Sequence, residues 1–342
     1  MTVRQIEKDG FPIIARIECL LSSDSDVGMA KTIGLATLSL ADMLGGWRPD
    51  ILLLIADRYE MLAPASVALA LRIPIAHIEG GEVSQGAIDD AVRNALTKLA
   101  HIHFTSTPLA RQRVIAMGEE PWRVHHAGAP SLDHLRRSKL YSREQLEQRL
   151  SLDLAQTTLL VAYHPVTIHR DTTDEADALF SALLQLSEQM VFVYPNSDAG
   201  SRSLIERTQR FAAESENIKL FVNLDAVTYW SLLGKVDMLI GNSSSGIMES
   251  ASCALPTVNI GMRQQGRERP CNILDADASQ KSILDAIHQA KSEAFRNCLH
   301  GMTNPYGSGH ASEMIAAILA TVPLERLLVK QPTPLIREIE AQ

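Results

Sequence analysis

Short apolar runs alternate with helix-like stretches along most of the chain. Apolar runs without polar alternation are typical of strands buried on both faces, as in a parallel sheet. Helical stretches such as 66–73, 174–189 and 282–295 lie between them. This rhythm predicts an α/β fold with parallel sheets that carry helices on both faces. The runs interpreted as strands are 50–57, 73–78, 101–106, 158–166, 190–196, 218–223, 238–243 and 256–261.

A charged and polar segment, residues 134–156, divides these strands into two sets. We expect two doubly wound, Rossmann-like domains, 1–155 and 156–322, with a ligand cleft between them. A last helix near 309–321 could pack on either domain. Residues 323–342 are expected to form a loosely attached tail, because a Pro-Thr-Pro stretch there interrupts any helix.

The composition excludes several classes of protein. The 342 residues, 46% hydrophobic and 21% charged, are ordinary for a globular protein and sufficient for two domains. A net charge of −8 argues against a general nucleic-acid binder, although a small phosphorylated ligand needs only a local nest of donors. No apolar run approaches the roughly 20 residues of a membrane span, and the amino-terminal end has no apolar signal core. We therefore expect neither a nucleic-acid nor a membrane partner.

The four cysteines are scattered and show no C-x-x-C spacing. Cysteine used in this way is typical of a reduced, cytoplasmic protein, and it makes structural zinc improbable. The cysteines are Cys19, Cys253, Cys271 and Cys298.

Polar residues follow the predicted strands at their carboxyl ends, where ligands bind in open α/β sheets. A single residue at such a place is often only a turn or a helix cap. Five polar groups around one predicted cleft are a better candidate for a site. They are Asp57-Arg58, the segment beginning at Glu79, His164, Asn196 and the segment 241–246.

The segment 241–250, GNSSSGIMES, follows an apolar run and opens a helix. A glycine, three hydroxyls and free N–H groups at a helix start suit a diphosphate, while a simple serine N-cap is the alternative. Glu249 could accept hydrogen bonds from ribose. Arg263, in the basic loop that follows the next strand, could reach a phosphate or remain solvated. His164 could act as acid, base or phosphate donor, or be a satisfied polar group.

The segment 76–92 packs four carboxylates around a glycine pair. The glycines would let the backbone approach a ligand closely. Asp89 and Asp90 fall in the first turn of a helix, and Arg93 lies four residues after Asp89, so a structural role stays open for them. Neither a D-x-D-x-D loop nor histidines at i and i+4 are present, which makes a metal site the weakest interpretation. Within this segment Glu79 and Asp89 are the candidates for chemistry, and Glu82 and Asp90 for structural roles.

Six segments in order carry a family resemblance: Asp57-Arg58, HIEGGE (77–82), GAIDDAVRNALTKLAHIHF (86–104), AGAPSLD (127–133), YHPVT (163–167) and GNSSSG (241–246). With them the chain closely resembles the hydrolysing UDP-N-acetylglucosamine 2-epimerases of sialic-acid biosynthesis and their relatives acting on bacillosamine derivatives. The resemblance runs from about residue 5 to 320 and implies a glycosyltransferase-B-like architecture. YHPVT and GNSSSG replace the H-R-R-E-N-type and D-S-G-G-type stretches of the non-hydrolysing enzymes.

The resemblance implies an anti elimination of UDP across C1–C2 of an acetamido nucleotide sugar, then hydration with inversion at C2. No hydride moves, so it implies no nicotinamide, and we expect no cofactor and no metal. It also implies a homo-oligomer, a dimer or a tetramer. The implied catalytic residues are Asp57, Glu79, Asp89 and His164. The implied nucleotide-binding residues are Arg58, His164, Asn196, Ser243, Ser244, Glu249 and Arg263.

One departure from the family concerns its leading strand, helix and Gly-Thr-Arg-like phosphate loop. Residues 6–11 resemble a segment well inside the family's first domain, and nothing in residues 1–56 replaces that loop. This keeps two alternatives open: a non-catalytic nucleotide-sugar-binding remnant, and a glycosyltransferase of the same architecture.

Overall fold

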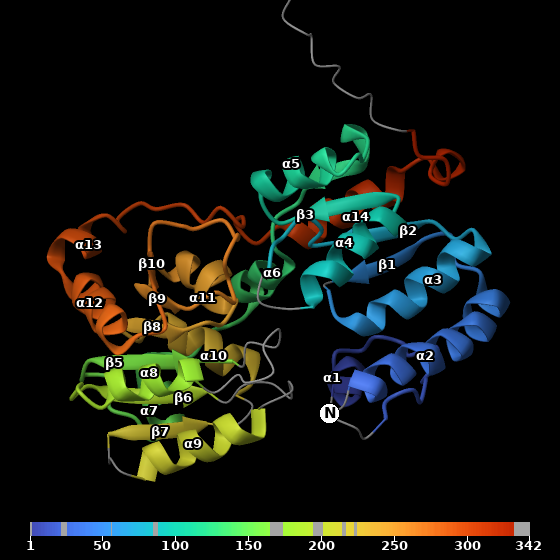
Figure 1. The fold of residues 1–342 in the computed structure, drawn as a ribbon. Helices are drawn as coiled ribbons and strands as arrows, with labels where there is room; N and C mark the ends of the chain where they lie inside the picture. The colour runs from blue at the N-terminus through green and yellow to red at the C-terminus, as the bar shows by residue number, and fades with distance from the viewer. Residues whose placement is uncertain are drawn as a thin grey trace, which may run out of the picture.

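Two parallel sheets, each with helices packed on it, make up the computed structural model (Figure 1). It describes residues 2–21, 26–55, 57–84, 88–164, 174–193, 201–213, 217–221 and 224–331. The α/β class and the parallel sheets predicted from the apolar runs are confirmed.

The first sheet has four strands in the order β1-β2-β3-β4. They are β1 (Leu52–Ile55), β2 (Ile75–Ile78), β3 (Ile102–Thr105) and β4 (Val124–His126). The inner strands β2 and β3 are buried at every position, as their uninterrupted apolar runs predicted. Among the described residues no strand pairs with the outer edge of β1. The side chains of Leu53 and Ile55, which share one face of this strand, are exposed.

The second sheet has six strands in the order β10-β9-β8-β5-β6-β7. They are β5 (Thr158–Ala162), β6 (Gln189–Val193), β7 (Ile218–Phe221), β8 (Met238–Gly241), β9 (Thr257–Ile260) and β10 (Ile273–Ala276). The order reverses beside β5, which pairs with β6 on one side and β8 on the other. Such a reversal opens a crevice at the carboxyl ends of the two strands, and it is where these sheets bind ligands.

The α-helices connect these strands and cover both faces of the sheets. They are α1 (Thr2–Lys8), α2 (Asp26–Trp47), α3 (Leu62–Leu71), α4 (Asp89–Leu99), α5 (Pro108–Ala116), α6 (Pro130–Arg137), α7 (Arg143–Leu150), α8 (Asp174–Leu183), α9 (Ser201–Ala213), α10 (Ala226–Leu233), α11 (Ser245–Met248), α12 (Gln280–Lys291), α13 (Glu293–Asn297) and α14 (Ala311–Thr321). Short 3₁₀ turns span Tyr59–Met61, Pro121–Arg123, Ser250–Cys253 and Leu324–Arg326.

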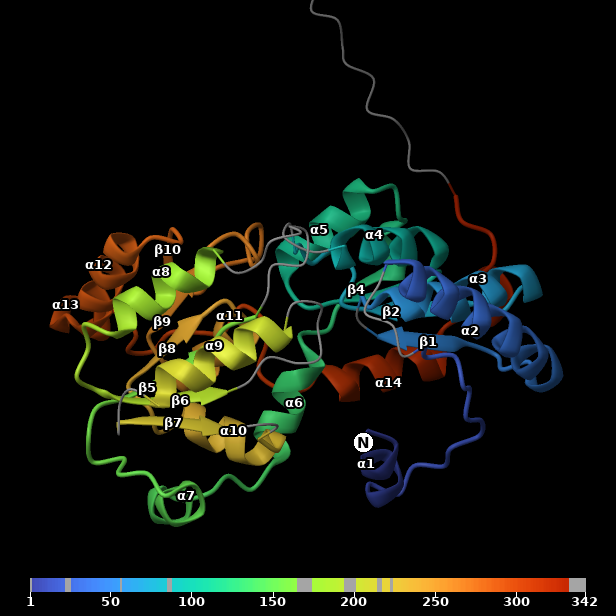
Figure 2. The ribbon, with the colours of Figure 1, turned by 60° about the horizontal axis from the view of Figure 1, so that its bottom comes forward.

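Helices lie on both faces of the second sheet (Figure 2). Its alternate side chains point to two separate cores. Leu159 and Val161 of β5 pack with α8, α9 and α12, whereas Leu160 packs on the other face with α7 and α10. Helix α7 precedes residue 155, yet its apolar side chains belong to this second core. The limits of the two domains, 1–155 and 156–322, therefore stay a prediction.

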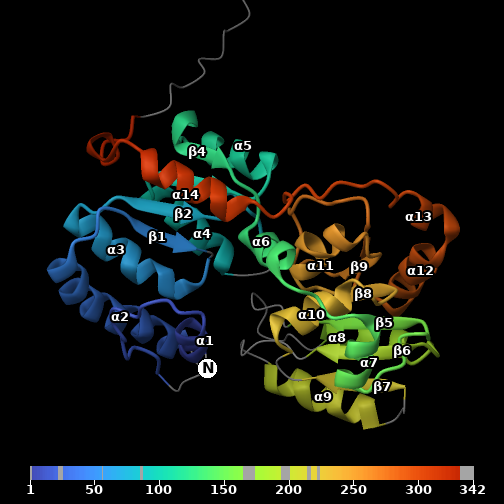
Figure 3. The same ribbon diagram turned by 180° about the vertical axis from the view of Figure 1, so that it is seen from behind.

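Helix α14 returns to the first sheet, which answers the question of where the last helix packs. Its Ala311 and Ile315 join Ile78 and Phe104 in one cluster, on the face opposite α3 and α4 (Figure 3). The chain thus crosses between the two sheets twice, and α14 ties its end to the first one.

Helix α2 differs from expectation. Within the described residues, Val27–Trp47 is long and apolar enough to cross a membrane by length and composition, although no such run was predicted. One side is buried, because Ala36 and Leu44 are inaccessible and Leu44 packs with residues of α3. The opposite side exposes Leu35 and Leu38.

The beginning of the predicted tail is fixed, not loosely attached. The Arg123 guanidinium, 1% exposed, donates to the carbonyls of Leu327 (2.9 Å) and Val329 (2.6 Å). The Lys330 ammonium reaches the buried Glu119 carboxylate at 2.8 Å. Burial raises the pKa of Glu119, but its bonds to His103, Lys330 and Lys98 outweigh this and lower the pKa to about 2. Residues 332–342 lie outside the described part of the chain.

We expect Arg123→Met to lower the free energy of unfolding by about 3–5 kcal/mol. The change removes the cation paired with the half-buried Glu120 carboxylate and the donor of the His101 and Leu327 carbonyls. Urea titration measures this. Arg137→Met, which breaks an exposed pair with Glu313, should cost less than about 1 kcal/mol. Equal effects of the two changes would contradict the anchoring role of Arg123.

Candidate functional site

Glu79 stands at the carboxyl end of β2 in a strained backbone conformation. Its φ is 69°, in the left-handed region that favours glycine, while its N–H donates to the Phe104 carbonyl at 2.8 Å. Holding a glutamate there costs about 1–3 kcal/mol, and such strain collects at functional sites. The half-buried side chain is thereby presented at the edge of the sheet where ligands bind.

The surroundings of Glu79 favour its protonated form. Its pKa is raised to about 7, mainly by burial, with smaller contributions from the charges of Asp57 and Glu82, while Arg267 and Arg93 act in the opposite direction. A carboxyl group that titrates near neutral pH can both accept and return a proton, as general acid–base catalysis requires.

Arg93 of α4 organises the acidic segment. Its guanidinium, 1% exposed, forms an ion pair with Asp57 and a second one with Asp90 at 3.2 Å. It also donates to the Ser84 hydroxyl at 3.1 Å and to the Glu82 carbonyl at 2.9 Å. Arg93 was expected to serve Asp89, the first residue of α4, but the pairs found hold Asp57 and Asp90.

The two neighbours of the candidate acids behave differently. Asp90 also accepts from the Ser84 N–H at 2.9 Å, which fits a structural role. Glu82 is 4% exposed, and within the described residues neither of its carboxylate oxygens has a hydrogen-bond partner. Arg58, expected to bind the nucleotide, pairs with Glu60 at 3.1 Å on the surface.

Packing accounts for the glycine pair after Glu79, and the expected close approach to a ligand stays a prediction. A Cβ on Gly81, whose φ is 79°, would lie 2.3 Å from the Ala110 carbonyl oxygen of α5. A Cβ on Gly80 would meet the Thr97 hydroxyl at 3.1 Å. Both glycines therefore let α4 and α5 pack closely against the loop after β2.

His164 and the 241–246 segment meet at the strand reversal of the second sheet. The Asn242 side chain accepts from the His164 N–H at 2.7 Å and donates to the His164 carbonyl at 2.8 Å. Asn242 is fully buried, and its own carbonyl accepts from Arg263 at 3.1 Å. The sequence singled out His164 and Arg263 but not the asparagine that connects them.

The His164 imidazole is neutral at pH 7. Burial, with a smaller contribution from Arg263, lowers its pKa to about 3. Within the described residues its Nδ1 is buried without a hydrogen-bond partner. A neutral imidazole can donate one N–H to a phosphate oxygen without carrying a proton away.

The three serines after β8 differ in their hydrogen bonds. Ser244 occupies the N-cap position of α11, yet its side chain makes no capping bond, so the simple N-cap interpretation is wrong for it. The Ser243 hydroxyl lies 3.2 Å from that of Ser245, which contacts Tyr229. Gly241 permits this turn, because a Cβ there would lie 2.1 Å from the Ala162 carbonyl oxygen of β5.

Glu249 ends α11 beside Ser131 and Trp230. Burial raises its pKa, and these two neighbours act in the opposite direction. Asn196 lies outside the described residues, and of Asp89 the structure shows the place, at the start of α4. No group of three His, Cys, Asp or Glu in the described segments could hold a metal ion.

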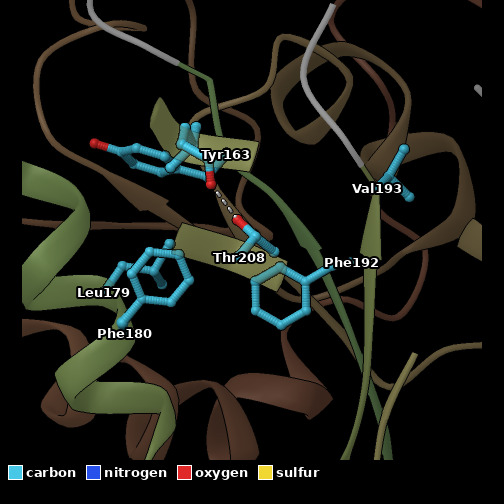
Figure 4. A pocket seen from close by; sticks show the side chains of 7 residues that line it. Tyr163, Leu179, Phe180, Phe192, Val193 and Thr208 are labelled. Carbon is cyan, nitrogen blue, oxygen red and sulfur yellow. Dashed lines mark hydrogen bonds between the residues drawn. The ribbon is translucent and has the colours of Figure 1, made fainter. Parts of the chain in front are cut away.

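Two cavities of the second sheet are poor candidates for the phosphate site. The apolar pocket between Tyr163, Phe192 and α8 holds about 10 Å³, room for one water molecule at most (Figure 4). A larger one of about 440 Å³ lies at the ends of β9 and β10. Its lining has three acidic residues, Glu175, Asp275 and Asp277, against one cation, Arg269, so its net negative charge would repel a diphosphate.

The loop between β9 and β10 contacts both the acidic residues near Glu79 and the segment 241–246 beside His164. Arg263 of this loop reaches Asn242, and Arg267 reaches the Val83 carbonyl at 3.2 Å and the Ser84 hydroxyl at 3.3 Å. One loop therefore places a charge beside each half of the candidate site: Arg267 acts on Glu79, and Arg263 acts on His164.

Comparisons with known proteins show which family the chain resembles. Residues 1–320 match the family model described as UDP-N-acetylglucosamine 2-epimerase. The chain is 35% identical to a Legionella pneumophila protein named UDP-N,N'-diacetylbacillosamine 2-epimerase (hydrolyzing), over 96% of this chain and 86% of that protein. A Campylobacter jejuni protein named GDP/UDP-N,N'-diacetylbacillosamine 2-epimerase (hydrolyzing) is 34% identical over the same shares.

Solved structures support the fold. The UDP-GlcNAc 2-epimerase of Neisseria meningitidis bound to UDP-GlcNAc superposes with a TM-score of 0.76 at 18% identity, over 89% of this chain and 84% of that one. The structure of an S. aureus protein, MnaA, with UDP also superposes with a TM-score of 0.76 at 18% identity, over 92% of this chain and 83% of that one. At such identities the likeness concerns the two-domain architecture.

Proposed function

Because the chain belongs to the UDP-N-acetylglucosamine 2-epimerase family, we propose that it is the hydrolysing kind, releasing UDP and a free 2-epimerised sugar. The substrate is a UDP-linked 2-acetamido sugar, either UDP-N-acetylglucosamine or a 2,4-diacetamido analogue. The observation that carries the proposal is the Glu79 carboxyl group, whose pKa burial raises to about 7, at the junction with the basic loop of the second sheet.

The reaction has two steps. A base takes the C2 proton, the C–H electron pair forms the C1=C2 bond, and the C1–O bond breaks as UDP leaves. Water then adds its oxygen to C1, and a proton returns to C2 from the opposite face. Glu79 is suited to one of these two proton transfers because its pKa lies near neutral pH, and a second carboxyl group serves the opposite face of the sugar. Asp57, held by Arg93, and Asp89 complete the proposed carboxylate set.

The second sheet holds the nucleotide in this proposal. His164 donates from a neutral imidazole to the departing diphosphate, and the Ser243 and Ser244 hydroxyls and Arg263 add donors. Glu249 and Asn196 are proposed for the nucleoside, and Arg58 for the nucleotide from the first sheet. A homo-oligomer in the cytoplasm belongs to the same proposal.

The test is to incubate the protein with each of the two nucleotide sugars and to measure free UDP and free sugar. We expect UDP and the 2-epimer in equal amounts from at least one of them. UDP binding without turnover would instead support the non-catalytic remnant. UDP release only after an acceptor is added would support a glycosyltransferase.

We expect Asn242→Ala to raise KM, and to weaken UDP binding, by about 10–30-fold. The change removes both bonds that hold the His164 backbone, each worth about 1 kcal/mol. Steady-state kinetics and calorimetry with UDP measure this. Asn217→Ala, which removes bonds to the Ser187 and Glu188 carbonyls beside β6, should leave KM unchanged. A KM equal to that of the unaltered protein in Asn242→Ala would contradict the positioning of His164.

A further inference from the structure

Two arginines of the β9–β10 loop reach opposite halves of the site. Arg263 donates to the Asn242 carbonyl, next to His164. Arg267, four residues later, leaves its own sheet and donates to the Val83 carbonyl and the Ser84 hydroxyl, both in the loop after β2. Its third contact is the Met248 sulfur at 3.2 Å. The half-buried Arg267 guanidinium is therefore fixed from both sheets.

The Ser84 hydroxyl is shared by two guanidinium groups. It accepts from Arg267 at 3.3 Å and from Arg93 at 3.1 Å, and Ser84 itself is 8% exposed. Arg93 in turn holds Asp57. The loop of the second sheet is thus connected through one oxygen to the group that fixes the catalytic carboxylates.

We propose that Arg267 is a positioning residue for the reaction, which brings a positive charge from the second domain to the Glu79 carboxylate when the two domains are in register. The inference rests on the proposed role of Glu79 as the group that moves the C2 proton. The inference adds that proton transfer by Glu79 depends on contact between the two domains.

The charges that face Glu79 determine the direction in which each substitution should shift its pKa. Asp57 at the end of β1 and Glu82 in the same loop are negative, and Arg93 of α4 is positive. Arg267 is the largest of the charge effects on the pKa of Glu79, second to burial, and it lowers that pKa. Glu82, buried without a hydrogen-bond partner among the described residues, raises it.

Arg113 of α5 offers a matched control, because it bridges the same two loops. It donates to the Gly266 carbonyl at 2.8 Å and to the Gly81 carbonyl at 3.3 Å. It is not among the principal charges that act on Glu79 within the described chain. Removing it weakens the junction while the charges on Glu79 stay.

The experiment compares the pH dependence of kcat/KM for four variants of the full chain. With Arg267→Gln we expect the acid limb to move to higher pH by about 1 unit, because an attractive charge is lost. Glu82→Gln should move it to lower pH, and Arg267→Lys should restore most of the original position. Arg113→Gln should lower the rate with the limb in place. An acid limb that Arg267→Gln leaves unmoved would overturn the proposal.

A second measurement does not depend on turnover. Proteins labelled with ¹³C at the glutamate carboxyl groups are titrated by NMR, and the Glu79 signal is assigned as the one missing in Glu79→Gln. The pH at the midpoint of the Glu79 titration should be higher in Arg267→Gln and unchanged in Arg113→Gln. If the unaltered protein releases no UDP from either sugar, the proposed function fails, while this titration still decides whether Arg267 acts on Glu79.

Discussion

Replacing Glu79 with glutamine should lower kcat for UDP release by about 10²- to 10⁴-fold, with KM changed less than about threefold. Glutamine has nearly the same shape but cannot take the C2 proton or return one. The nucleotide is held by residues of the second sheet, so its binding should persist. A coupled assay for free UDP over a range of substrate concentrations separates the two constants.

The matched control is Glu313→Gln, which neutralises an exposed carboxylate of α14 paired with Arg136 and Arg137. It should keep kcat within about twofold, since surface pairs contribute little. If Glu79→Gln kept more than a tenth of the original kcat, Glu79 would not be the group that moves the proton.

Replacing Arg93 with methionine should lower the free energy of unfolding by about 3–5 kcal/mol and abolish measurable turnover. The buried guanidinium neutralises Asp57 and Asp90 and satisfies Ser84 and the Glu82 carbonyl, so its loss leaves a cluster of carboxylates uncompensated. Urea unfolding measures the stability, and the UDP assay measures the turnover.

Arg93→Lys should be intermediate, because a lysine keeps the charge but cannot donate to four partners in a fork. Arg149→Met, which breaks an exposed pair with Asp225, should cost less than about 1 kcal/mol. A stable Arg93→Met protein with normal turnover would contradict the organising role given to Arg93.

The strands could be predicted where burial on both faces leaves an uninterrupted apolar run, as in β2, β3 and β5. Two strands were missed for physical reasons. β4 has three residues, two of which are histidines, and β10 places the exposed Asp275 in its short run. Strands at or near a sheet edge do not need apolar side chains on both faces, so periodicity does not reveal them.

The site could be predicted in part, because ligand-binding residues of such folds follow strands directly in the sequence. His164 and Ser243 were chosen in this way, and they do follow β5 and β8 closely. Arg93 and Arg267 were not recognised for their roles, since their partners are distant: Asp57 lies 36 residues from Arg93, and Ser84 lies 183 residues from Arg267. Only the packing of α4 and the crossing of the β9–β10 loop bring these pairs together.

The same limit applies to the glycine pair. The sequence shows two glycines after a candidate acid, and close approach to a ligand is a reasonable cause. In the structure the Ala110 carbonyl of α5 leaves no room for a side chain at Gly81, and no local sequence pattern predicts this contact. Helix positions set by tertiary packing are invisible to a pattern of residues along one segment.

The most direct test of a hydrolysing 2-epimerase is to run the reaction in D₂O and to locate deuterium in the products by NMR. The two-step mechanism predicts free UDP and a free sugar that carries one deuterium at C2 with inverted configuration, since the returning proton comes from a group in exchange with solvent. A free sugar without deuterium at C2 would contradict the mechanism. So would deuterium at C2 of an epimerised sugar that is still attached to UDP.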